Sequence, residues 1–119
     1  MREVFFILGE QDVVLWSDAS TSPVLLPDSR TRWVAIWKRR RRIVEIAHSH
    51  PMGPLGFSMT DETTMTALAS GLGRKVAFSV IAPNGMTRRE QEGNDVIVER
   101  EPWWANVLRL ASGMEKKEK

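Results

Sequence analysis

The amino-acid sequence predicts an α+β fold, in which a mixed β-sheet is flanked by helices within a single domain. Three observations lead to this prediction. Short runs of β-forming residues alternate with stretches of helical periodicity, the 119 residues have room for one ordinary domain, and the chain shows no internal repeat. The hydrophobic fraction of 42% is enough to form a packed core. The expected order is two strands, a helix, a strand, a helix, three strands and a final helix.

The chain is expected to begin with a β-hairpin. Residues 4–8 and 13–16 are apolar runs rich in β-formers, and the turn-forming sequence Gly9-Glu10-Gln11-Asp12 separates them. Residues 17–27 are rich in Ser, Asp and Pro, which favours a loop.

A helix is predicted next, with Asp28 as its N-terminal cap. Its packed face is expected to carry Trp33, Ile36, Trp37 and Arg40. The basic run 38–42 would end this helix, because cations suit the negative end of the helix dipole. Residues 43–50 follow as a largely apolar strand, and residues 51–57, with two prolines and two glycines, form a loop.

Ser58 or Thr60 is expected to cap the following helix, which ends at Gly71 or Gly73. Its apolar stripe comprises Met65, Leu68, Ala69 and Leu72. Three further strands are expected at residues 75–82, 86–90 and 96–99, joined by turns at 83–85 and 93–94. Pro102 then opens a last helix that runs to residue 112.

The domain is expected to span residues 1–113, with residues 114–119 as a charged, flexible tail. In the last helix, one residue of the pair Trp103-Trp104 is expected to pack on the sheet together with Val107, Leu108 and Ala111.

Charge and cysteine content exclude several kinds of chemistry. The 17 basic and 15 acidic residues give a net charge of +2, too small to indicate a polyanionic partner. The chain has no cysteine, which excludes disulfides, thiolate metal sites and thiol nucleophiles. No apolar run approaches the roughly 20 residues of a membrane helix, and no signal-peptide pattern is present. We therefore expect a cytoplasmic protein without a membrane partner.

Both histidines of the chain lie at the end of the strand predicted at 43–50, in the sequence His48-Ser49-His50. Residues i and i+2 of a strand point to the same face, about 6.5 to 7 Å apart, so both imidazoles can reach one metal ion. Asp61, on the first turn of the next helix, can supply a third ligand. Two histidines and one carboxylate leave a tetrahedral position for water, as in catalytic zinc sites.

The sequence His48-Ser49-His50-Pro51, followed after residues 52–57 by Ser58-Met59-Thr60-Asp61, is similar to the JAMM motif of the JAB1/MPN/Mov34 metalloproteases. The resemblance is close over residues 43–69 and extends through the order of elements over most of the chain. It implies a small, prokaryotic-type member with a JAB/MPN-like fold and zinc-dependent peptidase or isopeptidase activity. In that case His48, His50 and Asp61 bind zinc, and Ser58 hydrogen-bonds the oxyanion of the tetrahedral intermediate.

The resemblance also implies a general-base glutamate at an early strand. Glu3 precedes an apolar strand that ends in Gly9, which is similar to the family layout, and Glu10 is the second candidate. Glu45 is a poorer one, because alternation along the strand turns it away from His48.

The family often cuts after the C-terminal tail of a ubiquitin-like protein or releases a small carrier protein, so a protein or peptide substrate of this kind is implied. The alternative is an MPN-like interaction domain without catalysis. Its binding surface would be the cluster Arg39–Arg42 or the pair Trp103-Trp104. The basic stretch has little aromatic interleaving, which does not favour nucleic acid as the partner.

Overall fold

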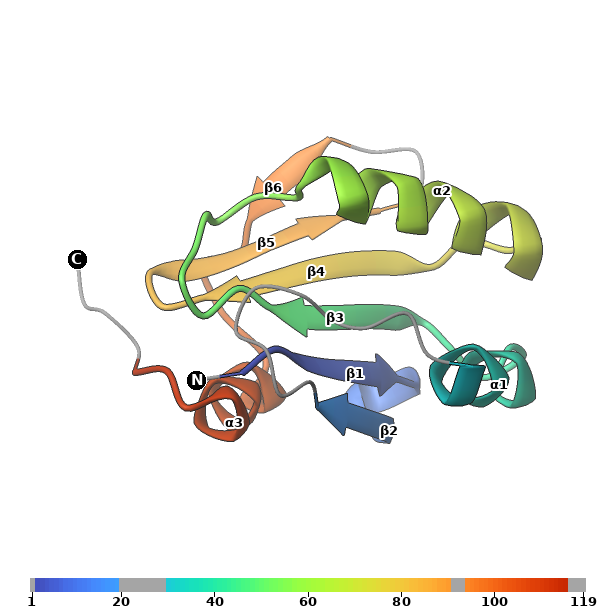
Figure 1. Cartoon of the computed structure of the whole chain (residues 1–119), viewed down its shortest axis with the longest axis horizontal. Helices are drawn as coiled ribbons and strands as arrows, with labels where there is room; N and C mark the ends of the chain where they lie inside the picture. The colour runs from blue at the N-terminus through green and yellow to red at the C-terminus, as the bar shows by residue number, and fades with distance from the viewer. Residues whose placement is uncertain (1, 20–29, 91–93, 116–119) are drawn as a thin grey trace.

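The structure, a computed structural model, describes residues 2–19, 30–90 and 94–115. Within them, the chain forms an α+β domain with a six-stranded mixed sheet and three helices (Figure 1). The strands are β1 (Val4–Leu8), β2 (Val14–Ala19), β3 (Glu45–Ser49), β4 (Ala77–Ala82), β5 (Gly85–Arg89) and β6 (Asp95–Ile97). The helices are α1 (Arg30–Lys38), α2 (Met59–Leu72) and α3 (Trp103–Ser112), and a 3-10 turn (Glu10–Asp12) joins β1 to β2.

The strand order in the sheet is β2-β1-β3-β4-β5-β6. β3 and β4 are parallel, and the other neighbouring pairs of described strands are antiparallel. Because β1 and β3 run in opposite directions, the start of β1 lies beside the carboxyl end of β3 (Figure 1). This arrangement brings the first residues of the chain to the strand end that carries the two histidines.

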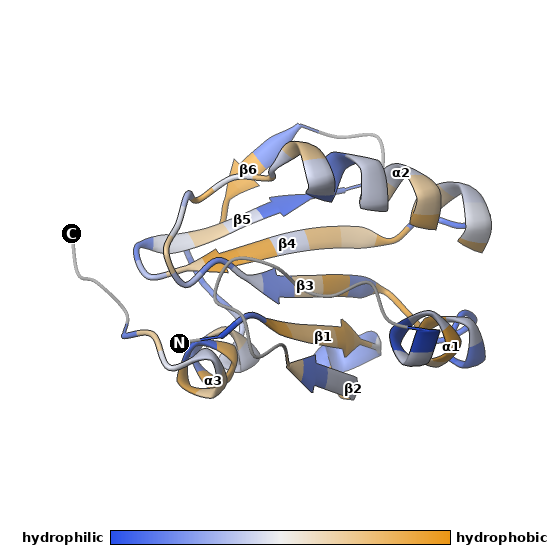
Figure 2. Ribbon diagram, viewed as in Figure 1, coloured by the Kyte–Doolittle hydropathy of each residue, from blue (hydrophilic) through white to orange (hydrophobic). Residues whose placement is uncertain are grey.

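The helices cover both faces of the sheet. On one face, α1 and α2 pack through Ile36, Met65 and Leu68 onto residues that include Phe5 and Phe78. On the other face, α3 packs through residues that include Trp104 and Leu108. β1 is buried along its whole length and, with β4, forms the hydrophobic centre of the sheet (Figure 2). Burying apolar surface on both sides of a central strand is what fixes this three-layer arrangement.

The expected hairpin, the helix that begins after Ser58 and the strand that carries the histidines are all present. β2 is longer than expected and includes residues 17–19 of the predicted loop, because these pair with β1 from Phe6 back to Val4. Ala69 and Leu72 of the predicted stripe on α2 are half-buried, and Met65 and Leu68 are buried. The expected cap Asp28 and the first residue of the turn at 93–94 lie outside the described residues.

The predicted packed face of α1 is correct for Ile36, which is buried, and wrong for the two tryptophans. Its buried residues are Arg32, Ala35 and Ile36, whereas Trp33 and Trp37 are exposed. Arg40 instead stacks on Trp37, with its Cζ 4.1 Å from a ring centroid of the indole. The buried face is thus displaced relative to the expectation, and it includes Arg32, which was not part of the predicted face.

α3 agrees with its prediction in part. Trp104 is fully buried, and it packs edge-on against Phe6 at a ring distance of 6.4 Å, whereas Val107 is exposed. Met114, at the start of the predicted tail, is buried, and residues 116–119 lie outside the described part of the chain. Among the described residues, no helix has the length and apolar character needed to cross a membrane.

Candidate metal centre

His48, His50 and Asp61 converge at the carboxyl end of β3. The two Nε2 atoms of the histidines lie 3.1 Å apart. The Asp61 carboxylate completes the group, with Oδ1 3.1 Å from the Nε2 atom of His48 and Oδ2 3.2 Å from that of His50. The structure therefore brings together all three residues that the sequence predicted as metal ligands, and this group could hold a metal ion.

The spacing of these groups is close to that around a single metal ion. Ligand atoms bound at 2.0 to 2.1 Å in a tetrahedron lie about 3.3 Å from one another. The two Nε2 atoms are 3.1 Å apart, each faces a different Asp61 oxygen, and with one ligand atom taken from each residue the three atoms lie within 4.8 Å of one another. The Nδ1 atom of His50 lies 2.9 Å from the carbonyl oxygen of Pro54. Donation of the Nδ1 hydrogen to that oxygen leaves Nε2 as the nitrogen with a lone pair, as a metal ligand requires.

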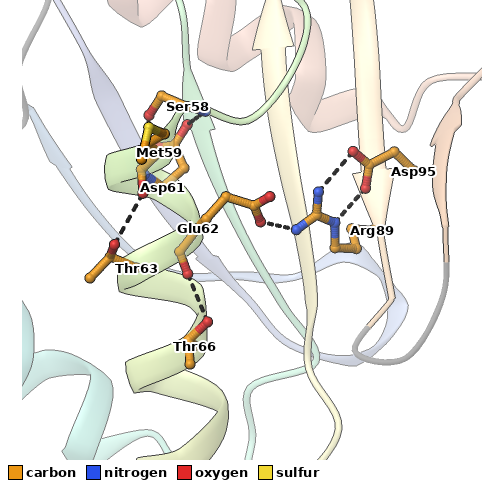
Figure 3. Close-up of polar contacts among 8 residues, drawn as sticks. All are labelled: Ser58, Met59, Asp61, Glu62, Thr63, Thr66, Arg89 and Asp95. Atoms are coloured by element: carbon orange, nitrogen blue, oxygen red, sulfur yellow. Dashed lines mark hydrogen bonds and ion pairs between the residues drawn. The ribbon is translucent and has the colours of Figure 1, made fainter.

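The N-terminus of α2 positions Asp61. Ser58 is the N-cap, and its Oγ accepts a hydrogen bond from the Asp61 backbone N–H at 3.1 Å. The Asp61 carboxylate accepts in return from the Ser58 backbone N–H at 2.7 Å, which completes a capping box (Figure 3). These two bonds satisfy amides that the helix leaves without intrahelical partners. The same bonds fix Asp61 where it faces the histidines.

The charges of the group act on each other. Burial lowers the pKa of His50, but its hydrogen bonds with Asp61 and Pro54 and the charges of Asp61 and Glu3 outweigh this, so the net shift is upward. Burial raises the pKa of the Asp61 carboxyl group. Hydrogen bonds with His48 and His50 lower this pKa by a larger amount, so the net pKa falls well below its usual range. Asp61 is therefore ionised throughout the neutral range and available as an anionic ligand.

Glu3 lies beside this group. It is buried, lines the same cavity as His48, His50 and Asp61, and contributes to the electrostatic shift of His50. The antiparallel register pairs Phe5 with His48, so continuing it by two residues places Glu3 opposite His50. Of the glutamates considered from the sequence, Glu3 is thus the one at the candidate metal centre.

The other two glutamates lie elsewhere. Glu10 is exposed, in the 3-10 turn that follows the opposite end of β1. Glu45 is buried on the other face of the sheet, where it accepts hydrogen bonds from Ser79 and Arg88. The expected orientation of Glu45 away from His48 is confirmed.

Ser49 holds Glu3 in place, a role that no sequence pattern indicates. It is fully buried, and its Oγ accepts a hydrogen bond from the Val4 backbone N–H at 2.7 Å. The peptide group that follows Glu3 is thereby attached to the residue between the two histidines. The odd position of Ser49 in the strand turns it to the face opposite the imidazoles, where it bonds the neighbouring strand rather than a metal.

Arg89 of β5 braces the segment that carries Ser58 and Asp61. Its guanidinium forms ion pairs with Glu62, the residue after Asp61, and with Asp95 of β6 (Figure 3). It also stacks over Phe57, the residue before Ser58, with the Cζ atom 4.8 Å from the ring centroid. Both sides of the segment 58–61 are therefore tied to the sheet through one side chain.

A cavity of about 530 Å³ opens at the metal group and extends between α1 and α2 over the sheet. Its lining is largely apolar, and it includes one buried cation, Arg32, together with Trp33. Ser58 also lines it, and accepting the bond from Asp61 leaves its hydroxyl hydrogen free to be donated into the cavity. The volume is typical of sites for small ligands or for a few residues of a peptide.

The two surfaces considered for an interaction domain are partly occupied by contacts within the chain. Arg39 donates to the carbonyl oxygens of Leu15 and Ala35, and Arg40 donates to that of Trp37. Trp103 is exposed, although its Nε1 donates to the Asp12 carbonyl oxygen at 3.1 Å. The basic cluster thus serves in part to close the carboxyl end of α1.

A scan of the chain against protein-family models gives no match, and a search of curated proteins gives none either.

Proposed function

We propose that the protein is a zinc-dependent amide hydrolase of the JAMM type, with a JAB/MPN-like fold, that cleaves a peptide or isopeptide bond. The observation that carries the proposal is the convergence of His48, His50 and Asp61, whose ligand atoms lie within 4.8 Å of one another, with Glu3 buried beside them. A protein substrate such as a ubiquitin-like or small carrier protein, and a cytoplasmic location, are part of this proposal.

The ligand set is that of a catalytic rather than a structural zinc site. Two imidazoles and one carboxylate would hold the ion and leave a fourth position for water. Zinc bound there would polarise the substrate carbonyl and lower the pKa of a water ligand towards about 7. Nitrogen and oxygen donors of this kind suit zinc, and the site lies in a cavity with room for a substrate.

The residues of the chain have separate roles in the proposed reaction. Glu3 takes the proton of the attacking water and passes it to the leaving amine. Ser58 donates its hydroxyl hydrogen to the carbonyl oxygen as negative charge develops there. Asp61 would bind the metal and also caps α2, and the reacting groups line one cavity.

Metal content is the first test. The protein should be purified without chelators or metal-affinity columns and analysed for bound elements beside His50→Ala. We expect about one zinc per chain in the wild type and a large loss in the variant, because one of three ligands is gone. Glu10→Gln is the matched control and should keep its zinc. A wild-type protein that binds no zinc at neutral pH would overturn the proposal.

Hydrolysis is the second test, on peptide and isopeptide substrates with zinc-loaded protein. Cleavage that depends on both zinc and Glu3 supports the proposal. Zinc binding without any cleavage would favour the interaction domain, in which the metal site has a structural role.

A further inference from the structure

Arg32 is a charged residue within the cavity of the candidate metal centre. Its side chain is 10% exposed, and it lines the cavity together with the three proposed ligands. Burying a cation against apolar walls is unfavourable unless it meets anionic or polar groups, and Asp18 is one such partner of Arg32. A guanidinium in the cavity lining bears on the kind of substrate that the cavity accepts.

The strand pairing fixes how far Arg32 lies from the metal group. Phe5 of β1 is opposite Asp18 of β2 on one side and opposite His48 of β3 on the other. Paired residues point to the same face, so these three side chains form a row. Arg32 donates to Asp18 at 2.8 Å, and its Cζ lies 4.9 Å from the Phe5 ring centroid. The guanidinium thus covers the middle of the row, about 5 to 10 Å from His48.

The rest of the lining is suited to an apolar side chain. The cavity wall is formed by residues of the sheet and of both helices that also belong to the hydrophobic core: Phe5, Ile36, Ile46, Met65, Leu68 and Phe78. A ligand that combines an anionic group with a hydrophobic group therefore matches the residues that line the cavity. In a peptide, an apolar residue at the C-terminus has both, because its α-carboxylate is free.

We propose that Arg32 binds the α-carboxylate of the substrate, and that the enzyme releases an apolar amino acid from the C-terminus of a peptide. This inference rests on the proposed function. The α-carboxylate always lies on the amine side of the last amide bond, so the C-terminal amino acid is the leaving group. One residue of extended chain spans about 3.5 Å, which suits a carbonyl at the metal and a carboxylate at Arg32.

The reaction is a simple hydrolysis. The oxygen of water bonds to the carbonyl carbon, the C–N bond breaks, and Glu3 delivers a proton to the departing amine. The products are a peptide with a new carboxylate and a free amino acid, with no change of oxidation state. Asp18 orients the guanidinium through Nη2, and a planar guanidinium with five N–H donors is suited to bind a second carboxylate.

The test compares paired substrates on zinc-loaded full-length protein. N-acylated dipeptides that end in Leu or Phe are offered with a free carboxylate and with a C-terminal amide. We expect kcat/KM to be about tenfold to a hundredfold higher for the carboxylates, as expected for a hydrogen bond between charged groups. Equal rates on carboxylate and amide would overturn the assignment of Arg32 and leave the hydrolase proposal intact.

Substitutions test whether Arg32 causes the preference for a free carboxylate over the amide. Arg32→Gln should reduce the carboxylate rate to that of the amide, with zinc content measured on the same samples. Asp18→Asn removes the competing carboxylate and should keep or increase the preference, and Arg42→Gln, an exposed control, should leave it unaltered. Because Arg32 is buried, Arg32→Lys is included with a thermal unfolding curve, and it should keep part of the preference. A preference that survives in folded Arg32→Gln contradicts the proposal.

Direct binding separates the two proposals. Calorimetry on zinc-loaded Glu3→Gln measures the binding of acetyl-leucine and of its amide. One outcome is that acetyl-leucine binds to the Glu3→Gln protein and that this binding is lost when Arg32 is also replaced, while the wild type hydrolyses no substrate. That result would support carboxylate binding by Arg32 and overturn the proposed hydrolysis. Absence of both binding and hydrolysis would overturn both.

Discussion

Phe5 and His48 are directly opposite each other in the antiparallel pair of β1 and β3. This single register places Glu3 across from His50 and brings Arg32, which covers Phe5, towards the same metal group. The proposed proton-transfer residue and the proposed carboxylate-binding residue thus owe their positions to the same strand pair.

Replacing Glu3 should separate metal binding from catalysis. Glu3→Gln keeps the shape of the side chain and removes its basicity, so we expect zinc to stay bound while kcat/KM falls by about 10² to 10⁴. Elemental analysis and a hydrolysis assay on the same sample measure the two effects. Glu10→Gln, with its exposed side chain, should leave both unchanged. A Glu3→Gln enzyme with wild-type rate would show that another group moves the proton.

Ser49 should act through Glu3. Ser49→Ala leaves the Val4 N–H buried without its acceptor, which costs about 1 to 3 kcal/mol of unfolding free energy. Because Glu3 also loses its anchor, we expect kcat to fall while zinc stays bound. Ser79→Ala is the control, since Ser79 is equally buried but bonds Glu45 on the other face. If both variants lose stability and only Ser49→Ala slows hydrolysis, the positioning role is supported; equal rates would refute it.

Ser58 combines a helix cap with a proposed contact to the reacting carbonyl, and two substitutions separate them. Ser58→Ala removes the cap and should cost about 1 kcal/mol, whereas Ser58→Gly should cost a few tenths of that, because glycine is tolerated at the cap. Both remove the hydroxyl. We therefore expect both to lower kcat, with only Ser58→Ala markedly lowering Tm. If kcat instead falls only in Ser58→Ala, the variant with the lower Tm, the helix cap alone would account for the effect.

Arg89→Met removes the brace on the segment 58–61. We expect stability to fall by about 1 kcal/mol, less so at high salt, because ion pairs at a partly exposed site are screened. Zinc binding should weaken by about tenfold, as is usual when contacts that orient ligands are lost. Arg88→Met breaks its pair with Glu45 on the opposite face and should leave the zinc dissociation constant unchanged. The zinc dissociation constants of the two variants are compared on folded protein, so a difference in their stability does not affect the result.

Zinc affinity should fall as the pH is lowered. The raised pKa of His50 means that this imidazole holds a proton at higher pH than an ordinary histidine, and the proton must leave before the metal binds. Above that pKa no proton is displaced and affinity is constant, and below it affinity falls by up to about tenfold per pH unit. A competition titration with a chromophoric chelator between pH 5.5 and 8 measures this. A flat profile over the whole range would contradict the expectation.

The local sequence was sufficient for the metal group because all of its members lie in one short segment. His48 and His50 share a strand face by simple alternation, and the cap at Ser58 fixes Asp61 by its spacing. Glu3 is different, because it is distant in sequence from these residues. Its place depends on the pairing of β1 with β3, which no local pattern shows; the family resemblance implied only a glutamate at an early strand.

The features that the sequence did not predict all depend on tertiary contacts. Ser17, Asp18 and Ala19 have little β propensity, yet they extend β2 because β1 offers them partners. On α1, Trp33 and Trp37 were expected on the packed face, and Arg32 was not. Arg32 is buried there because it meets Asp18 and the Phe5 ring, a combination that exists only once three separate segments are assembled.

The backbone N–H of Arg2 donates to the Ser112 carbonyl oxygen at 2.8 Å, and Glu3 follows it directly at the metal group. A segment fused ahead of residue 2 is therefore attached within two residues of the candidate metal centre. A polyhistidine tag at this end would supply imidazoles that compete for the metal being measured. Recombinant protein for metal analysis is best prepared with a removable tag or none.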